Sequence, residues 1–126
     1  MYKLLLIALG GAIGSMLRFL ISVSIHEWMN KVFFWGTISV NLLGSFIIGG
    51  AWAFFEQNGQ YDNLRFFVMI GLLGGFTTFS SFSLEAITLL KNGEIKMAIS
   101  YILISNIGGI LAAFLSYFLF KSLLLK

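Results

Sequence analysis

The chain has 126 residues, of which 59% are hydrophobic and 10% are charged, and its formal net charge is +3. Soluble proteins average about 25% charged residues, so a chain this short and this apolar is not expected to fold as a soluble domain. It contains no cysteine and one histidine, which excludes a disulfide framework, a thiolate metal site and a histidine metal cluster. The positive charges are spread along the chain and form no stripe, so we expect no nucleic-acid partner.

Four apolar segments are long enough to cross a membrane, which takes about 20 apolar residues for each helix. They cover residues 4–25, 32–55, 64–90 and 97–120. The polar joints at 26–31, 56–63 and 91–96 are short, so successive helices should be antiparallel neighbours with both termini on one side. The first segment is too long for the core of a signal peptide, so we expect it to stay in the mature protein. The sequence therefore predicts an all-α integral membrane protein with one transmembrane domain covering residues 1–126.

Positive charges beside the helices normally set the orientation of a membrane protein. The side of the termini carries Lys3, Arg65, Lys121 and Lys126. The other side carries Lys31, Lys91 and Lys96, with Arg18 in the far half of the first segment. This near balance is compatible with a chain that inserts in both directions and forms an antiparallel dimer. A fixed topology with a weak bias fits the same count.

In the first segment, Gly10 and Gly14 are four residues apart, as are Gly11 and Ser15, and this spacing predicts a face for close helix packing. Arg18 follows one turn later, inside the apolar run, where a charge is costly unless it reaches water or a partner. Two roles stay open for it. It is either an anchor at the membrane interface or a source of positive potential that attracts anions to a vestibule.

The second segment places Thr37, Asn41 and Ser45 four residues apart, and therefore on one helix face. Within lipid, such a polar stripe should turn toward the protein. The amide of Asn41 can donate two hydrogen bonds, either to an ion in a pore or to a neighbouring helix, and the second role is the common one in membranes.

The third segment contains the most unusual stretch, residues 71–85, with the sequence GLLGGFTTFSSFSLE. Glycines lower helix stability and hydroxyls compete for backbone hydrogen bonds, so we predict that the helix is broken within this stretch, near its centre. Non-helical backbone at this depth must be buried in protein or line a polar cavity. The alternative is that the glycines serve helix packing, since Gly71 and Gly75 have the small-xxx-small spacing.

In an antiparallel dimer, the two-fold axis lies in the membrane plane at mid-depth, which is near Thr77. Carbonyl groups freed by a break in each chain would then converge on a cation. Phe79 and Phe82 are three residues apart, and their positive ring edges would meet an anion if they faced a pore. Their alternative role is lipid-facing filler in a chain with 14 phenylalanines.

The fourth segment has Tyr101, Ser105, Gly109 and Ala113 four residues apart, with Asn106 offset from that face. The face carries hydroxyls first and small residues after them. It fits either tight packing or a narrow polar track.

These motifs resemble the small fluoride-channel family called Fluc or CrcB along nearly the whole chain. The resemblance rests on residues 10–19 (GGAIGSMLRF), 37–44 (TISVNLLG) and above all 74–85 (GGFTTFSSFSLE). It implies four-helix subunits in an antiparallel, dual-topology homodimer with two fluoride pores, in a bacterial plasma or inner membrane. It also implies a structural sodium ion at the dimer centre, held by the backbone carbonyls of Gly74 and Thr77.

The resemblance further implies a fluoride pathway lined by Phe79, Phe82, Asn41, Tyr101 and Ser105, to which we add the hydroxyls of Thr37 and Ser81. Arg18 matches an arginine near the vestibule, and Glu85 matches a carboxylate at the end of a polar track. An ionised Glu85 would repel an anion, so we expect it to be protonated, paired with a lysine or turned toward the rim. Some members carry a serine where this chain has Gly109, so its hydroxyl track should be shorter or rely on water.

The sequence thus predicts a fluoride-selective channel for passive export of the anion, with lipid and a second copy as partners. It shows no nucleotide motif and no arrangement of nucleophile and base, so we expect neither an enzyme nor a pump. Two alternatives stay open. One is a small dual-topology, proton-coupled exporter of cationic compounds, which needs a carboxylate within the membrane, and the other is an assembly subunit that transports nothing.

Overall fold

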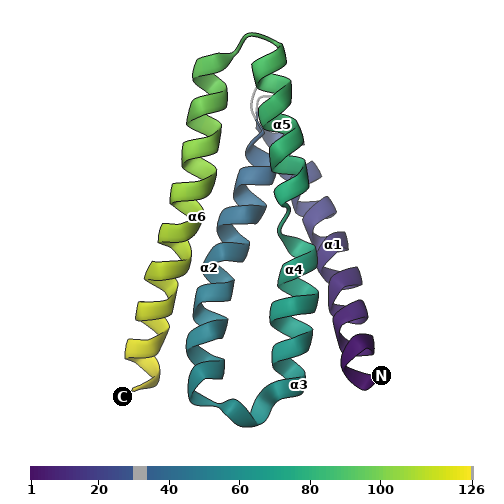
Figure 1. Cartoon of the computed structure of the whole chain (residues 1–126), viewed down its shortest axis with the longest axis vertical. Helices are drawn as coiled ribbons and strands as arrows, with labels where there is room; N and C mark the ends of the chain where they lie inside the picture. Colours follow the sequence, from purple (N-terminus) through teal and green to yellow (C-terminus); the bar gives the residue numbers. More distant parts are fainter. Residues whose placement is uncertain (30–33, 126) are drawn as a thin grey trace.

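The computed structural model describes residues 1–29 and 34–125, which form a bundle of four long apolar rods. The first rod is α1 (Tyr2–Trp28), the second is α2 (Trp35–Gln57), and the last is α6 (Ile95–Leu124). The third rod is assembled from η1 (Gly59–Tyr61), α3 (Asp62–Arg65), the π-helix η2 (Phe66–Leu72), α4 (Leu73–Phe76) and α5 (Phe79–Lys91). Both termini lie at the same end of the bundle (Figure 1). The predicted all-α membrane fold with four spans is therefore confirmed.

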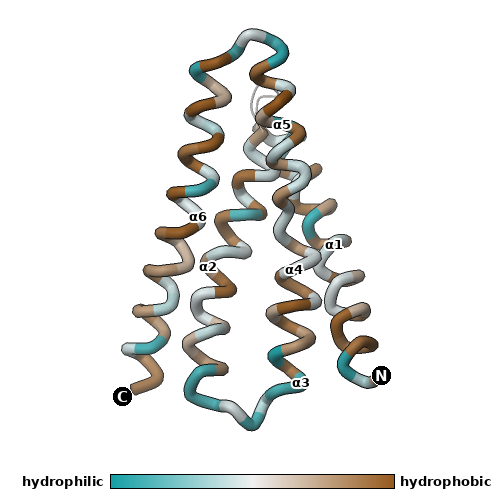
Figure 2. The backbone as a smooth tube through the Cα atoms, in the orientation of Figure 1, coloured by the Kyte–Doolittle hydropathy of each residue, from teal (hydrophilic) through white to brown (hydrophobic). Residues whose placement is uncertain are grey.

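The helices begin and end within a few residues of the predicted positions. The first and fourth are longer than predicted, and the second ends two residues later, at Gln57. Its predicted start at Val32 lies outside the described residues, as do Lys31 and Lys126 of the charge count. Hydrophilic residues gather at the turn between α2 and the third rod and at the turn between α5 and α6, whereas hydrophobic residues dominate the rods themselves (Figure 2).

Helix α1 packs closely against the first half of the third rod, through glycines on both sides. A Cβ atom at Gly10 would lie 2.5 Å from the carbonyl oxygen of Phe67, and one at Gly75 would lie 2.5 Å from that of Gly11. Gly71 approaches Gly10 in the same way. The backbones could not come this close with larger residues, so the packing interpretation of Gly71 and Gly75 is correct.

The hydrophobic core lies at the far end of the bundle, where α2, α5 and α6 meet. Its buried members are Ile38, Phe82, Ala86, Leu89, Ala98 and Tyr101. Helix α2 is the central helix, since 39% of its most apolar 18-residue stretch is buried. Only 6% of the corresponding stretch of α6 is buried. Most of the surface of α6 is therefore left for lipid or for another protein chain.

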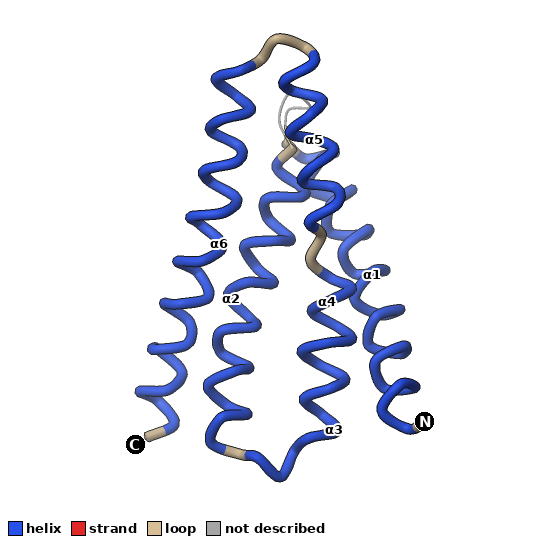
Figure 3. Tube along the Cα trace, viewed as in Figure 1, coloured by secondary structure: helices blue, strands red, loops and turns tan. Residues whose placement is uncertain are grey.

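The third rod loses its helical form at Thr77 and Thr78. Helix α4 ends at Phe76 and α5 begins at Phe79, and the backbone between them is extended, with φ/ψ of −81°/157° at Thr77 and −146°/115° at Thr78. Figure 3 shows this non-helical segment between α4 and α5. The side chain of Thr78 then caps α5, since its Oγ1 accepts a hydrogen bond of 3.1 Å from the N–H of Ser81.

Candidate functional site

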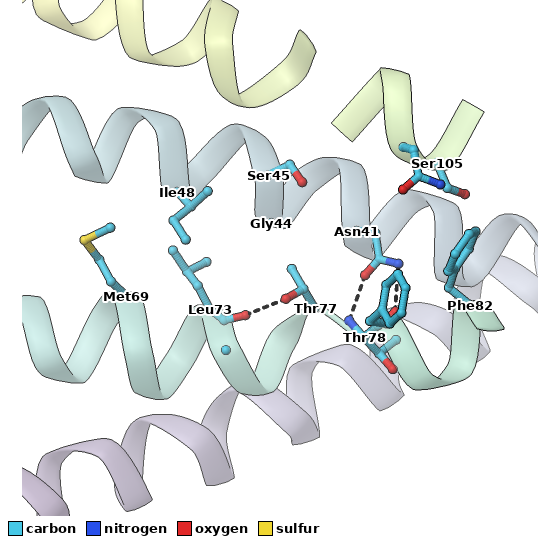
Figure 4. A pocket seen from close by; sticks show the side chains of 13 residues that line it. Asn41, Gly44, Ser45, Ile48, Met69, Leu73, Thr77, Thr78, Phe82 and Ser105 are labelled. Atoms are coloured by element: carbon cyan, nitrogen blue, oxygen red, sulfur yellow. Dashed lines mark hydrogen bonds between the residues drawn. The ribbon is translucent and has the colours of Figure 1, made fainter. Parts of the chain in front are cut away.

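A pocket of about 300 Å³ lies beside the extended segment (Figure 4), and that segment lies near the middle of the bundle (Figure 3). Its wall combines side chains of α2, of both halves of the third rod and of α6. The lining residues that carry polar side chains are Asn41, Ser45, Thr77, Thr78, Ser105 and Asn106. Non-helical backbone at membrane depth requires such a cavity or burial in protein, and here Thr78 is buried while the pocket opens next to it.

Asn41 holds the extended segment in place through both ends of its amide group. Its Oδ1 accepts a hydrogen bond of 2.8 Å from the N–H of Thr78, and its Nδ2 donates one of 3.0 Å to the Thr78 carbonyl. The amide nitrogen carries a second N–H, which forms no hydrogen bond within the described part of the chain. Asn41 therefore joins two helices and still has one donor group at the wall of the pocket.

The bond from Thr78 to Asn41 has a consequence for the end of α4. In a continuous helix, the N–H of Thr78 would bond to the carbonyl of Gly74. Here that N–H points to Asn41 instead, so the Gly74 carbonyl loses its usual partner. Gly74 is also exposed, and a Cβ atom placed on it would meet no atom within 4 Å. Packing against α1 thus accounts for Gly71 and Gly75, but it does not account for Gly74.

Phe79 and Phe82 both line the pocket, with ring centroids 5.5 Å apart and an angle of 43° between the ring planes. Their environments differ. Phe82 is 8% exposed and lies 5.3 Å from the ring of Tyr101, whereas Phe79 is 75% exposed at the start of α5. The open side of Phe79 is therefore left for lipid or for a second copy.

Glu85, one helical turn beyond Phe82, is held by two hydroxyl groups. The Oγ1 of Thr37 donates a hydrogen bond of 2.7 Å to one carboxylate oxygen, and the hydroxyl of Tyr101 donates to the other. Among the described residues Glu85 forms no ion pair, so pairing with a lysine is not what stabilises it. Thr37 and Glu85 line a second cavity, of about 490 Å³, together with Ser22 and His26 of α1.

The remaining predicted residues lie in three different places. Ser105 lines the first pocket, and its buried Oγ has no hydrogen-bond partner in the part of the chain that is described. Ser81 belongs to the cap of α5, where its Oγ accepts a hydrogen bond of 3.0 Å from Thr78. Arg18 is half-buried on α1, and it neither lines the two polar cavities nor forms an ion pair within residues 1–29 and 34–125.

The polar stripe of α2 faces the interior as predicted, since Thr37 contacts Glu85, Asn41 contacts Thr78, and Ser45 lines the first pocket. Sequence reasoning missed Thr78 as the partner of Asn41, because the two residues are 37 positions apart. It also left Asn106 off the polar face, although that side chain reaches the pocket wall beside Ser105. An asparagine next to the predicted track was the available signal.

Comparison with known proteins identifies the family of this chain. Residues 5–117 match the model of a family described as CrcB-like protein, Camphor Resistance (CrcB). A protein of Parabacteroides distasonis named fluoride-specific ion channel FluC is 46% identical over 124 residues, which cover 98% of this chain and 97% of that protein. Proteins of the same name from Magnetococcus marinus and Mesorhizobium japonicum are 44% and 41% identical. These matches cover 86% and 98% of this chain, and 89% and 99% of the respective relatives.

The four apolar spans, the polar pocket at mid-bundle and the matches over nearly the full length agree with one another. The chain is a multi-pass bacterial membrane protein that belongs to the CrcB family.

Proposed function

We propose that this protein is a fluoride-selective ion channel through which the anion leaves the cell passively. The observation that carries the proposal is the pocket beside Thr77 and Thr78, where an apolar bundle gathers amide and hydroxyl groups next to non-helical backbone. The relatives from three bacteria that are named as fluoride-specific channels support the same function.

The chemistry of the pocket suits a small, strongly hydrated anion. Such an ion crosses the membrane only if protein groups replace the water that it gives up. The free N–H of Asn41 and the hydroxyl of Ser105 are donors at the pocket wall. The ring edges of Phe79 and Phe82 add a weak positive potential. A larger halide would fit the same donors less well, because its charge is spread over a larger radius.

Beyond Phe82, the pathway continues toward Glu85 and the second cavity. The carboxylate there accepts hydrogen bonds from the hydroxyls of Thr37 and Tyr101, so these two hydroxyls hold Glu85 and do not bind the anion directly. Ser81 supports the pathway indirectly, through the cap of α5. Arg18 contributes as a long-range positive charge at the entrance, because it lies on the outer helix α1 and away from the pocket wall.

The proposal includes an antiparallel homodimer in a lipid membrane. Gly74 and Phe79 are exposed and line the pocket. A second copy packed on this face would therefore complete the open wall of the pocket. Two copies of the interruption would then face each other across the two-fold axis. The freed carbonyl of Gly74 and the carbonyl of Thr77, from each chain, form a set of oxygen donors that suits a hard cation such as sodium.

Fluoride efflux from liposomes tests the function directly. Vesicles loaded with potassium fluoride and containing the purified protein should release fluoride when valinomycin balances the charge. The same vesicles loaded with potassium chloride should release almost no chloride. Equal chloride release would contradict selectivity, no release of either ion would support a non-transporting subunit, and proton-driven uptake of a cationic dye would support an exporter.

The cation is tested by replacing sodium. Protein purified with N-methylglucamine in place of sodium should melt at a lower temperature and should lose its dimeric size in detergent, because the carbonyl groups would repel one another. Adding sodium back should restore both. Identical melting curves with and without sodium would contradict a structural sodium ion while leaving the channel function intact.

A further inference from the structure

Ser45 of α2 lies directly opposite Gly109 of α6. A Cβ atom placed on Gly109 would lie 3.3 Å from the Oγ of Ser45 and 4.0 Å from its Cβ. The hydroxyl of Ser45 therefore occupies nearly the position that the side chain of a larger residue at 109 would take. Where these two residues meet, α6 has no side chain because residue 109 is glycine, whereas α2 has the hydroxyl of Ser45.

The Ser45 hydroxyl belongs to the wall of the first pocket, along with Asn41 and Ser105 (Figure 4). Asn41 comes from the preceding turn of the same helix, and Ser105 comes from the turn of α6 that precedes Gly109. The Oγ of Ser45 forms no hydrogen bond within the described ranges, and neither does that of Ser105. A serine in a helix commonly bonds to a carbonyl of the preceding turn, and Ser45 does not.

We infer that Ser45 is a binding residue of the anion pathway, and that it donates from α2 the hydrogen bond that α6 lacks at Gly109. Ser105 of α6 and Ser45 of α2 are then two successive hydrogen-bond donors, one on each of the two helices that pack together here. This inference rests on the proposed channel function. It adds a hydroxyl of α2 to the pathway. The hydroxyl track then continues past Gly109 through Ser45, whereas the sequence alone suggested a shorter track.

The inference is tested by removing the hydroxyl at residue 45 of α2 and adding one at residue 109 of α6. Ser45→Ala should lower the rate of fluoride efflux about tenfold or more, since a hydrogen bond to an ion contributes about that factor. Adding Gly109→Ser to Ser45→Ala should restore most of the rate. The new Cβ atom fits, because in this double variant its nearest remaining neighbour is the Cβ of residue 45 at 4.0 Å. Gly109→Ala in the Ser45→Ala background refills the same space without a donor, so it should restore little if Ser45 acts by hydrogen bonding and as much as Gly109→Ser if Ser45 acts only by packing.

Ser39→Ala is the matched control, because Ser39 lies on the same helix but outside the pocket wall. It should leave efflux unchanged. If Ser45→Ala does not assemble into the dimer, Ser45→Cys replaces it, since the thiol is close in size and a weak donor. The inference is wrong if the Ser45 variant matches the wild type, or if Gly109→Ser restores nothing in an assembled protein. An inactive wild type would instead contradict the channel function and the inference together.

Discussion

At the scale of single residues, Asn41 decides where the third rod stops being helical. Its amide takes the place of the helical partner that the Thr78 N–H has lost, and it also donates to the Thr78 carbonyl. Because Thr78 is only 7% exposed, water cannot readily replace the amide. One residue thus keeps the extended segment open, frees the Gly74 carbonyl and presents a donor to the pocket.

Asn41→Ala should therefore reduce both stability and fluoride efflux. A buried backbone group left without a partner costs about 1 to 3 kcal/mol, so we expect the free energy of unfolding to fall by about 1 to 3 kcal/mol for the N–H of Thr78. Thermal melting in detergent and efflux from liposomes measure the two effects.

Asn58→Ala is the control for this substitution, since Asn58 also donates to a backbone carbonyl, that of Phe54, but at the end of α2. It should lower the melting temperature slightly and leave efflux unchanged. An Asn41→Ala protein with wild-type melting and wild-type efflux would show that Asn41 neither holds the interruption nor serves the anion.

At the scale of elements, the first half of the third rod has two faces with different tasks. Gly71 and Gly75 face α1, where the two backbones are in contact. Gly74 faces away from α1, and nothing in the described chain occupies the space beside it. The same short glycine run therefore serves helix packing on one side and leaves a bare backbone on the other.

Alanine at these two positions should separate the two tasks. Gly75→Ala should lower the melting temperature of the subunit, because its Cβ would lie 2.5 Å from the Gly11 carbonyl oxygen and overpacking costs about 1 to 3 kcal/mol. Gly74→Ala should leave the helix content and α1 packing intact, and any defect should appear in dimer assembly or efflux. The opposite pattern, with Gly74→Ala unfolding the subunit, would contradict this division.

At the scale of the whole molecule, one subunit leaves large apolar surfaces uncovered. Much of α6 is exposed, and so are Phe79 and Gly74 beside the pocket. Lipid can cover the apolar side chains, but it cannot satisfy carbonyl groups at mid-depth. We therefore expect the face that carries Gly74 to meet a second copy.

The absence of cysteine makes this dimer easy to test with single thiols. Phe79→Cys, at an exposed position beside the pocket, should form a crosslinked dimer with a short thiol-specific reagent. Leu5→Cys, near the end of α1, should not, because an antiparallel dimer places the two copies of residue 5 on opposite membrane faces. In intact cells, a membrane-impermeant maleimide should label one fraction of Tyr2→Cys from outside and the rest only after permeabilisation. Labelling of all copies from one side would contradict dual topology.

The sequence by itself determined the class of the protein and the depth of its site. Apolar runs of membrane-spanning length specify four helices, because lipid leaves the backbone no other partner than itself. The four-residue spacing of Thr37, Asn41 and Ser45 specified one polar helix face. That face must turn toward the protein, because lipid gives polar groups no hydrogen-bond partner. The mixture of glycine and hydroxyl residues at 71–85 marked the stretch in which the structure has its extended residues, Thr77 and Thr78.

Only the tertiary structure decided which groups meet. Sequence spacing orders residues along one helix, but the rotation and shift between two helices depend on how their side chains and glycines pack. For this reason the pairing of Asn41 with Thr78, the capture of the Thr37 and Tyr101 hydroxyls by Glu85 and the position of Ser45 opposite Gly109 could not be read from the chain. Each of these contacts joins residues more than ten positions apart, where periodicity carries no information and packing alone sets the distance.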